Sequence, residues 1–231
     1  ADYPDSSLGN QLKTIARMMA GGSRTKIYMA SKGGWDNHNN MVQYNNNTEG
    51  THANLLGDLS ESVAAFQEDI QNMGLDNKVL TVIFSEFGRK IIQNGSRGTD
   101  HGTLSSMFLI GRGVDGGVIG NNINLSDQDN PGAPNPEQIQ YDYRQVFSTV
   151  LQDWLGANDD SLSSTFKRQE YITNRPTFIN ESNLVPDSCY YTPQPPVTCA
   201  CIRVRLFLEG FYDSQLQQMH TQLLDRNALP N

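Results

Sequence analysis

The sequence predicts an α/β domain with a largely parallel sheet flanked by helices, because buried apolar runs alternate with amphipathic stretches. The run KVLTVIFS at residues 78–85 is continuous and β-branched, which is typical of a strand buried on both faces. Residues 51–73 instead place apolar side chains on one face at helical spacing, and Gly74 ends the pattern. Strands that alternate with helices in this way are typical of βαβ units.

The remaining elements of this domain follow from the same two periodicities. Residues 7–20 repeat apolar side chains at helical spacing and stop at a pair of glycines, which suits a helix C-terminus. Short strands are predicted at 25–31 and 105–110, each followed by a loop rich in glycine. Residues 138–155 form a further amphipathic segment, which predicts another helix.

The pattern changes after these elements, and the change sets the expected domain organisation. Residues 1–180 are predicted to form the α/β domain, and the proline-rich residues 181–198 a linker. Residues 199–231 contain the alternating stretch CIRVRLFLEGFYD, from Cys201, which predicts the opening strand of a β-rich module. One strand cannot bury its apolar face alone, so we expect the chain to stop inside or just before a second domain.

Composition and charge narrow the classes of function. Hydrophobic residues make up 37 % and charged residues 18 % of the chain, which is ordinary for a soluble globular protein. The net charge is −8, and no basic stripe of the kind found in nucleic-acid-binding proteins is present. No apolar run approaches the length of a membrane span. The first residues lack the pattern of a signal peptide, so the chain is interpreted as cytosolic or already processed.

The three cysteines lie close together, late in the sequence. They are Cys189, Cys199 and Cys201. A zinc site would need a fourth ligand at suitable spacing, and no histidine lies nearby in the sequence. A disulfide from Cys189 to either Cys199 or Cys201 is the better interpretation, and it implies an oxidising compartment.

Side chains that can bind metals follow the predicted strands. Ligands of open α/β sheets bind beyond the carboxyl ends of the strands, which is where these side chains are expected to lie. Carboxylate oxygens and neutral imidazole nitrogens suit Zn²⁺ or a similar divalent ion, which could polarise a phosphoryl or sulfuryl oxygen. The candidate ligands are Asp36, His38, His52, Glu86, Asp100 and His101, with Arg89 beside them.

Each candidate also has a structural interpretation that stays open at this point. Asp36 could cap a turn, and His38 could be an exposed loop residue. His52 opens the predicted helix at 51–73 and could be satisfied by backbone groups. Glu86 could form a structural ion pair with Arg89. The pair Asp100-His101 is flanked by glycines in GTDHG, and such glycines permit close approach of the backbone to a ligand.

Six blocks of sequence together carry a resemblance to a known family. They occur in the order GGWDNHNN, THANLLGDLSESVAAF, VIFSEFGRK, NGSRGTDHG, FLIGRGVDGGVIG and DYRQVFSTVLQDWLG. Residues 7–156 resemble the C-terminal half of a family of secreted bacterial proteins of unknown function, often made with a twin-arginine signal. That family looks like a branch of the alkaline phosphatase and sulfatase superfamily. The tail from Val204 is similar to the start of a module of Bacteroidetes-type surface proteins.

The resemblance implies roles for particular residues. Glu86 matches a metal-binding carboxylate at a strand end, but Phe87 stands where the superfamily has a histidine. His101 fits a later metal-binding histidine, and Asp36 fits an earlier aspartate paired with His38 or His52. The nucleophile of the superfamily would lie upstream of residue 1. The resemblance therefore implies that an N-terminal segment or a partner chain completes the domain.

Two functions are expected on these grounds. The first is a metal-dependent hydrolase of phosphate or sulfate esters with an alkaline-phosphatase-like fold. The second is a non-catalytic structural or binding component of a cell-surface or extracellular assembly. Either protein would be secreted or attached to the cell surface, with the periplasm as a further location.

Overall fold

A computed structural model describes residues 1–46, 48–121 and 139–183, together with the backbone of residues 203–208. The described chain divides into two compact units. The first contains residues 1–115, 180–183 and the strand at 203–208, and the second contains residues 116–121 and 139–179. Within the described residues, no helix is long and apolar enough to cross a membrane.

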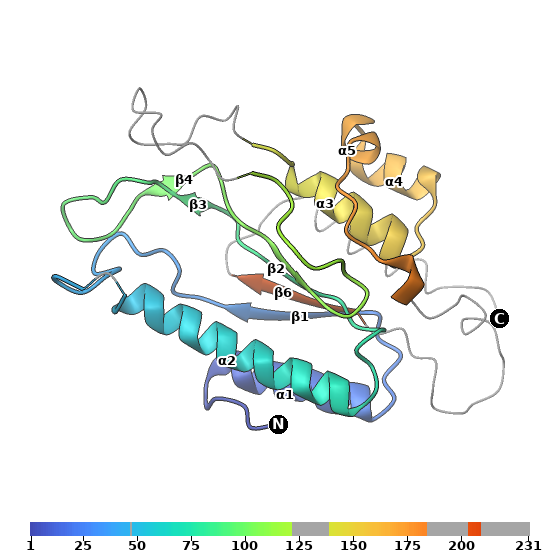
Figure 1. The fold of residues 1–231 in the computed structure, drawn as a ribbon, viewed down its shortest axis with the longest axis horizontal. Coiled ribbons are helices and arrows are strands. Elements are labelled where there is room, and N and C mark those ends of the chain that lie inside the picture. Colours follow the sequence, from blue (N-terminus) through green and yellow to red (C-terminus); the bar gives the residue numbers. More distant parts are fainter. Residues whose placement is uncertain (47, 122–138, 184–202, 209–231) are drawn as a thin grey trace. The chain divides into compact units, whose positions relative to one another are not determined.

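The first unit consists of two long helices and a four-stranded sheet (Figure 1). Its long elements are α1 (Ser7–Ala20), β1 (Ile27–Lys32), α2 (Thr51–Asn72), β2 (Thr81–Phe84), β5 (Phe108–Ile110) and β6 (Arg203–Leu208). Two short strands, β3 (Gly88–Arg89) and β4 (His101–Gly102), form a separate antiparallel pair, and a 3-10 turn covers Glu181–Asn183. The predicted α/β class is confirmed.

The four-stranded sheet has the order β1-β6-β2-β5. β6 runs parallel to both β1 and β2, whereas β5 runs antiparallel to β2. The sheet is therefore mixed, and the prediction of a largely parallel sheet was too strong. The apolar run at 105–110 predicts a strand but carries no information about its direction. The strand that forms, Phe108–Ile110, lies at the end of the sheet and is partly exposed, so the prediction of a buried strand was wrong.

The position of β6 also differs from expectation. Residues 203–208 were expected to open a separate module, but they pair with β1 and β2 inside the sheet of the first unit. The predicted division into residues 1–180, 181–198 and 199–231 stays a prediction. The proposed disulfide stays one as well, because Cys189, Cys199 and Cys201 lie outside the described residues.

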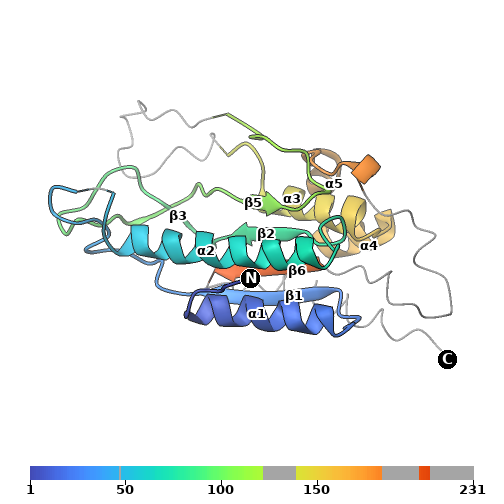
Figure 2. The same ribbon diagram turned by 60° about the horizontal axis from the view of Figure 1, so that its bottom comes forward.

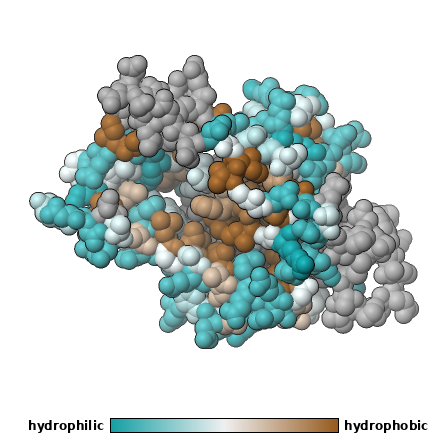
Figure 3. All heavy atoms as spheres, in the orientation of Figure 1, coloured by the Kyte–Doolittle hydropathy of each residue, from teal (hydrophilic) through white to brown (hydrophobic). Residues whose placement is uncertain are grey.

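Helices α1 and α2 pack together against one face of the sheet (Figures 1 and 2). Tyr28 and Ala30 of β1 and Ile83 of β2 join them in one apolar core, in which Phe66 and Ile70 of α2 are fully buried. The outer surface of these helices, at the bottom of Figure 3, is mainly hydrophilic. Both helices thus have the amphipathic pattern that the sequence predicts.

Local capping explains where α1 and α2 begin and end. The hydroxyl of Ser6 accepts a hydrogen bond from the backbone N–H of Gly9 at the start of α1. Gly22 follows its end with a φ of 78°, and Gly74 follows α2 with a φ of 67°. Such left-handed conformations favour glycine, so both predicted helix ends are confirmed.

The second unit is helical. It contains α3 (Tyr143–Thr149), which continues as a π-helix (Val150–Trp154), followed by α4 (Asp159–Phe166) and α5 (Glu170–Thr173). Asp142 and Gln145 form a capping box at the start of α3. The capping box explains why the helix begins at Tyr143, five residues after the predicted start.

Candidate metal centre

Two loops carry the candidate site, and both follow strands that run in the same direction. The first site loop (residues 33–41) follows β1, and the second site loop (residues 85–102) follows β2. Because β1 and β2 are both parallel to β6, their trailing loops lie at the same edge of the sheet. This placement is the one that the sequence analysis assumed.

Backbone hydrogen bonds join the two loops directly. The N–H of Asn40 donates to the carbonyl of Ser96 over 3.0 Å, and the N–H of Met41 donates to the carbonyl of Arg97 over 2.9 Å. The N–H of Thr99 donates to the carbonyl of Asn37 over 3.2 Å. The loops therefore hold each other in a fixed register, although residues 37–41 and 96–99 form no regular strand.

The glycines that flank Thr99–His101 serve this contact between the loops. A Cβ on Gly98 would lie 2.5 Å from the carbonyl oxygen of Asn37 and closer still to the backbone of His38. A Cβ on Gly102 would lie 2.6 Å from the carbonyl of Arg89. The close approach is thus between backbone segments, whereas the sequence analysis had suggested a close approach to a ligand.

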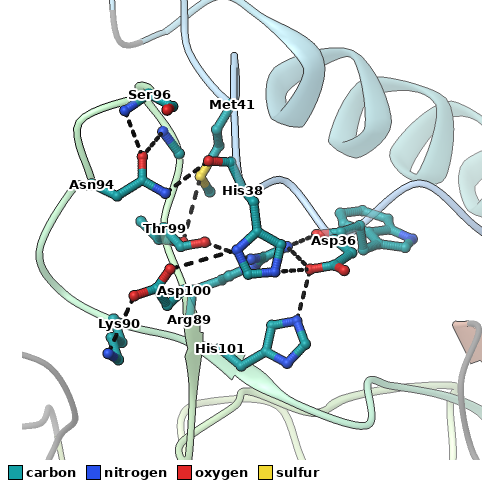
Figure 4. Close-up of polar contacts among 12 residues, drawn as sticks. Asp36, His38, Met41, Arg89, Lys90, Asn94, Ser96, Thr99, Asp100 and His101 are labelled. Carbon is teal, nitrogen blue, oxygen red and sulfur yellow. Dashed lines mark hydrogen bonds and ion pairs between the residues drawn. The ribbon is translucent and has the colours of Figure 1, made fainter.

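Asn94 fastens the second site loop to the first. Its amide nitrogen donates to the carbonyl of His38 over 2.7 Å. Its amide oxygen accepts hydrogen bonds from the backbone N–H groups of Ser96 and Gly98, over 2.9 and 3.1 Å. These three bonds fix the backbone position of His38 from the opposite loop (Figure 4).

Asp36, His38 and His101 converge at the meeting point of the loops (Figure 4). Nε2 of His101 lies 2.7 Å from Oδ1 of Asp36, and Nε2 of His38 lies 2.9 Å from the same oxygen. Their side chains are 57 %, 47 % and 49 % exposed for Asp36, His38 and His101. One ligand atom from each residue lies within 4.8 Å of the other two.

Arg89 contacts the carboxylate of Asp36 from a position that is less exposed to solvent than the carboxylate itself. One guanidinium nitrogen lies 3.2 Å from Oδ1 of Asp36 and also donates to the carbonyl of Trp35. The other donates to the carbonyl of Thr99 over 2.8 Å. Because the Arg89 side chain is only 15 % exposed, this planar fork is a fixed support for the site.

The pKa values of both carboxylates fall below their usual range. The hydrogen bond from His101 lowers the pKa of Asp36, and the positive charges of His38 and Arg89 act in the same direction. The hydrogen bond from Lys90 lowers the pKa of Asp100, with a further contribution from His38. Both carboxylates are therefore ionised at neutral pH, which is the form that binds cations.

Asp100 lies behind His38 and outside the converging group. Its Oδ1 is 3.6 Å from Nδ1 of His38, and its Oδ2 is 3.3 Å from Nζ of Lys90. A carboxylate that faces the second ring nitrogen of a histidine orients the imidazole and raises the basicity of the ligating nitrogen. Asp100 therefore supports His38, a different role from the direct ligation expected from the sequence.

Phe87 faces the site as a stacking partner. Its ring lies parallel to that of His101, with centroids 3.9 Å apart and an angle of 9° between the planes. The guanidinium carbon of Arg89 lies 5.0 Å from the centroid of the Phe87 ring. The sequence resemblance marks Phe87 only as the replacement of a histidine, and no sequence pattern indicates the supporting roles of Asn94 and Lys90.

The other two predicted ligands, His52 and Glu86, do not belong to the converging group of described residues. His52 is half-buried and meets the Trp35 ring edge-on at 5.7 Å, with no hydrogen bond at Nδ1. Burial lowers its pKa, and the charge of Arg89 adds to this effect. Glu86 accepts a hydrogen bond from Ser85 over 3.3 Å, and the carboxylate that pairs with Arg89 is that of Asp36.

The converging group fits a small divalent ion after a slight widening. Ligand atoms around a tetrahedral ion with bonds of about 2.1 Å are about 3.4 Å apart. The two Nε2···Oδ1 distances are 2.7 and 2.9 Å, so each imidazole would retreat by roughly half an ångström. Side-chain rotation in exposed residues provides such a movement.

Comparison with known proteins identifies the family. The model of a family described as a protein of unknown function, DUF1501, matches residues 7–171, and the chain belongs to this family. No curated protein matches the chain, and no solved structure matches it. Family membership therefore assigns no activity, and the site geometry is the basis for a functional proposal.

Proposed function

We propose that this member of the DUF1501 family binds one divalent metal ion, with zinc as the best match, through Asp36, His38 and His101. The observation that carries the proposal is the convergence of one carboxylate oxygen and two imidazole nitrogens within 4.8 Å of one another. This mixed set of ligands suits zinc better than the hard cations Ca²⁺ and Mg²⁺, which prefer oxygen ligands alone.

The number of ligands favours a catalytic site over a structural one. Structural zinc sites use four protein ligands, whereas catalytic sites use three and leave the fourth position to water or substrate. The three side chains here are about half exposed, so an open position would face solvent. The supporting contact of Asp100 behind His38 is a further feature of metal-binding histidines.

We further propose that the centre hydrolyses phosphate or sulfate esters. A bound divalent ion supplies polarisation of a phosphoryl or sulfuryl oxygen. Lys90, which is 32 % exposed, adds positive charge beside the site and favours an anionic substrate. We expect the attacking Ser or Thr on an N-terminal segment or on a partner chain that completes the domain.

The sequence resemblance described above supports this reaction class. A relation to the alkaline phosphatase and sulfatase superfamily would also account for helices packed on a sheet that contains parallel strands. It favours a secreted or surface location, as does the predicted disulfide. These points remain proposals together with the enzymatic activity.

Calorimetric titration of the 231-residue chain with Zn²⁺ tests metal binding. We expect one ion per chain, and we expect Asp36→Asn and His101→Gln to weaken binding by more than about tenfold. Asp160→Asn is the matched control, because it removes an exposed carboxylate of α4 outside the site. A wild-type chain that binds no zinc, or an Asp36→Asn variant that binds it equally well, would refute the proposal.

A second assay tests hydrolysis separately from binding. Aryl phosphate and aryl sulfate esters should release their phenols in the presence of zinc, and His101→Gln should abolish the release. Because the nucleophile is expected outside the chain, the assay should include the intact natural protein. If the intact protein binds zinc but does not hydrolyse these esters, the proposed metal site is supported and the proposed hydrolase activity is refuted.

The second candidate function is a non-catalytic structural or binding role at a cell surface. One observation favours it, because Oδ1 of Asp36 already has three polar partners in His38, His101 and Arg89. The group is thus satisfied without an ion and could act as a link between the two loops. In that case Asp36→Asn would lower the thermal stability, and zinc would not raise it.

A further inference from the structure

Four side chains of the site form a closed ring of contacts. Arg89 and His101 both contact Oδ1 of Asp36, over 3.2 and 2.7 Å. Phe87 closes the ring on the opposite side, because it stacks on His101 at 3.9 Å and lies 5.0 Å from the guanidinium carbon of Arg89. Each member of the ring therefore touches two others, and Phe87 is the only one of the four whose side chain has no polar atom.

We propose that Phe87 is the positioning residue of this centre: its ring holds the His101 imidazole and the Arg89 guanidinium so that both address the same oxygen of Asp36. His101 is half exposed, and apart from Phe87 its ring contacts Asp36 over 2.7 Å and the His38 ring at 5.0 Å between centroids. A parallel ring at 3.9 Å covers one of its faces and restricts its rotation. The metal-binding part of the inference rests on the proposed function.

The stacked geometry also determines what residue 87 contributes. The lone pair of an imidazole nitrogen lies in the plane of the ring, so an ion bound to His101 lies in that plane. A ring stacked on the face of His101 lies outside the plane and cannot coordinate the same ion. Phe87 therefore acts as a wall beside the ligand, and the open coordination position stays available.

The electron-rich face of Phe87 adds an attractive interaction. An aromatic ring attracts the guanidinium of Arg89 and favours an imidazole that becomes more positive when it binds a cation. A leucine at position 87 would keep much of the apolar volume but lose the flat face. We therefore expect Phe87→Leu to lower the affinity for Zn²⁺ by about 3- to 10-fold, whereas Phe87→Tyr should retain it.

The experiment compares three variants of the full chain with the wild type. Zn²⁺ affinity is measured by calorimetry and the ligand geometry by the visible absorption of bound Co²⁺. The direction of the His101 ring in the metal-free protein is measured by its nuclear Overhauser signals to neighbouring protons, because its chemical shift would change with the loss of the Phe87 ring current alone. Tyr44→Leu is the matched control, because Tyr44 is 77 % exposed and lies outside the ring of contacts. Thermal unfolding is recorded for every variant to separate positioning from folding.

The results expected for a positioning role differ from those of a purely structural role. Phe87→Leu should change the His101 signals and the Co²⁺ spectrum and weaken Zn²⁺ binding, whereas Phe87→Tyr should keep all three as in the wild type. His101 signals that are the same in Phe87→Leu and in the wild type would overturn the inference, whether or not the protein binds metal. If the wild type binds no metal but its His101 signals still change in Phe87→Leu, the proposed function is rejected and the positioning role of Phe87 is supported.

Discussion

The contact between the two site loops predicts a strong effect of one added methyl group. In Gly98→Ala, the new Cβ would lie 2.5 Å from the carbonyl oxygen of Asn37. The nearest atom is the carbonyl carbon of His38 at 2.3 Å, and an ordinary contact begins at 3.4 Å, so the two loops would have to separate by about 1.1 Å. The hydrogen bond from Thr99 to Asn37, now 3.2 Å, would lengthen to about 4 Å and break.

The expected loss of stability follows from the bonds that cross this contact. Separation of the loops also stretches the 2.7 Å bond from Asn94 to the carbonyl of His38. Two bonds at about 1 kcal/mol each give a loss of about 2 kcal/mol, which agrees with the usual cost of overpacking. The same movement displaces His38, so Zn²⁺ affinity should fall as well.

Gly95→Ala is the matched control, because a Cβ at this position of the same loop would have no neighbour within 4 Å. Urea unfolding of the two variants measures the difference, and we expect Gly95→Ala to stay within about 0.5 kcal/mol of the wild type. Equal midpoints for Gly98→Ala and Gly95→Ala would show that the loops do not approach as described.

Three further predictions concern single side chains. Partial burial lowers the pKa of His52, so as the pH falls below about 6.5 this residue is protonated in the unfolded chain before it is protonated in the folded protein. The wild type should therefore lose more unfolding free energy between about pH 7.5 and 5 than His52→Gln does. Equal pH dependence of the two proteins would contradict this. Arg89→Lys keeps the charge but loses the planar guanidinium that contacts Trp35, Thr99 and Asp36. The affinity for Zn²⁺, measured by calorimetry, should fall by about tenfold. Unchanged affinity would count against the supporting role of the guanidinium. Asp142→Ala removes the capping box of α3 and should lower the unfolding free energy by about 1 kcal/mol in urea, whereas a neutral effect would show that the cap contributes nothing.

The convergence of Asp36, His38 and His101 could be predicted from the sequence alone. Their positions after β1 and β2 determine which edge of the sheet they occupy, because the strands run in the same direction. The periodicity of residues 51–73 likewise predicted α2 to within one residue of its end. Both inferences depend on local pattern and on a general rule of sheet topology.

Side-chain direction beyond the strand ends could not be predicted in the same way. Glu86 and Arg89 both follow β2, but the carboxylate of Asp36 pairs with Arg89, which lies in β3 opposite His101 of β4. Phe87, just before β3, stacks on His101 of β4, which is a contact between residues that are distant in the sequence. The direction of β5 and the place of β6 depend on contacts between distant segments, which no local pattern encodes.

The place of β6 has a consequence for the order in which the protein can fold. Because β6 separates β1 from β2, the facing edges of these strands stay unpaired until residue 203 has been synthesised. Residue 203 follows the end of β2 at Phe84 by 119 residues, which take about 6–24 s at a rate of about 5–20 residues per second. During this interval the nascent chain exposes two strand edges with unpaired backbone N–H and C=O groups, so its yield in the cell should depend on chaperones that shield them.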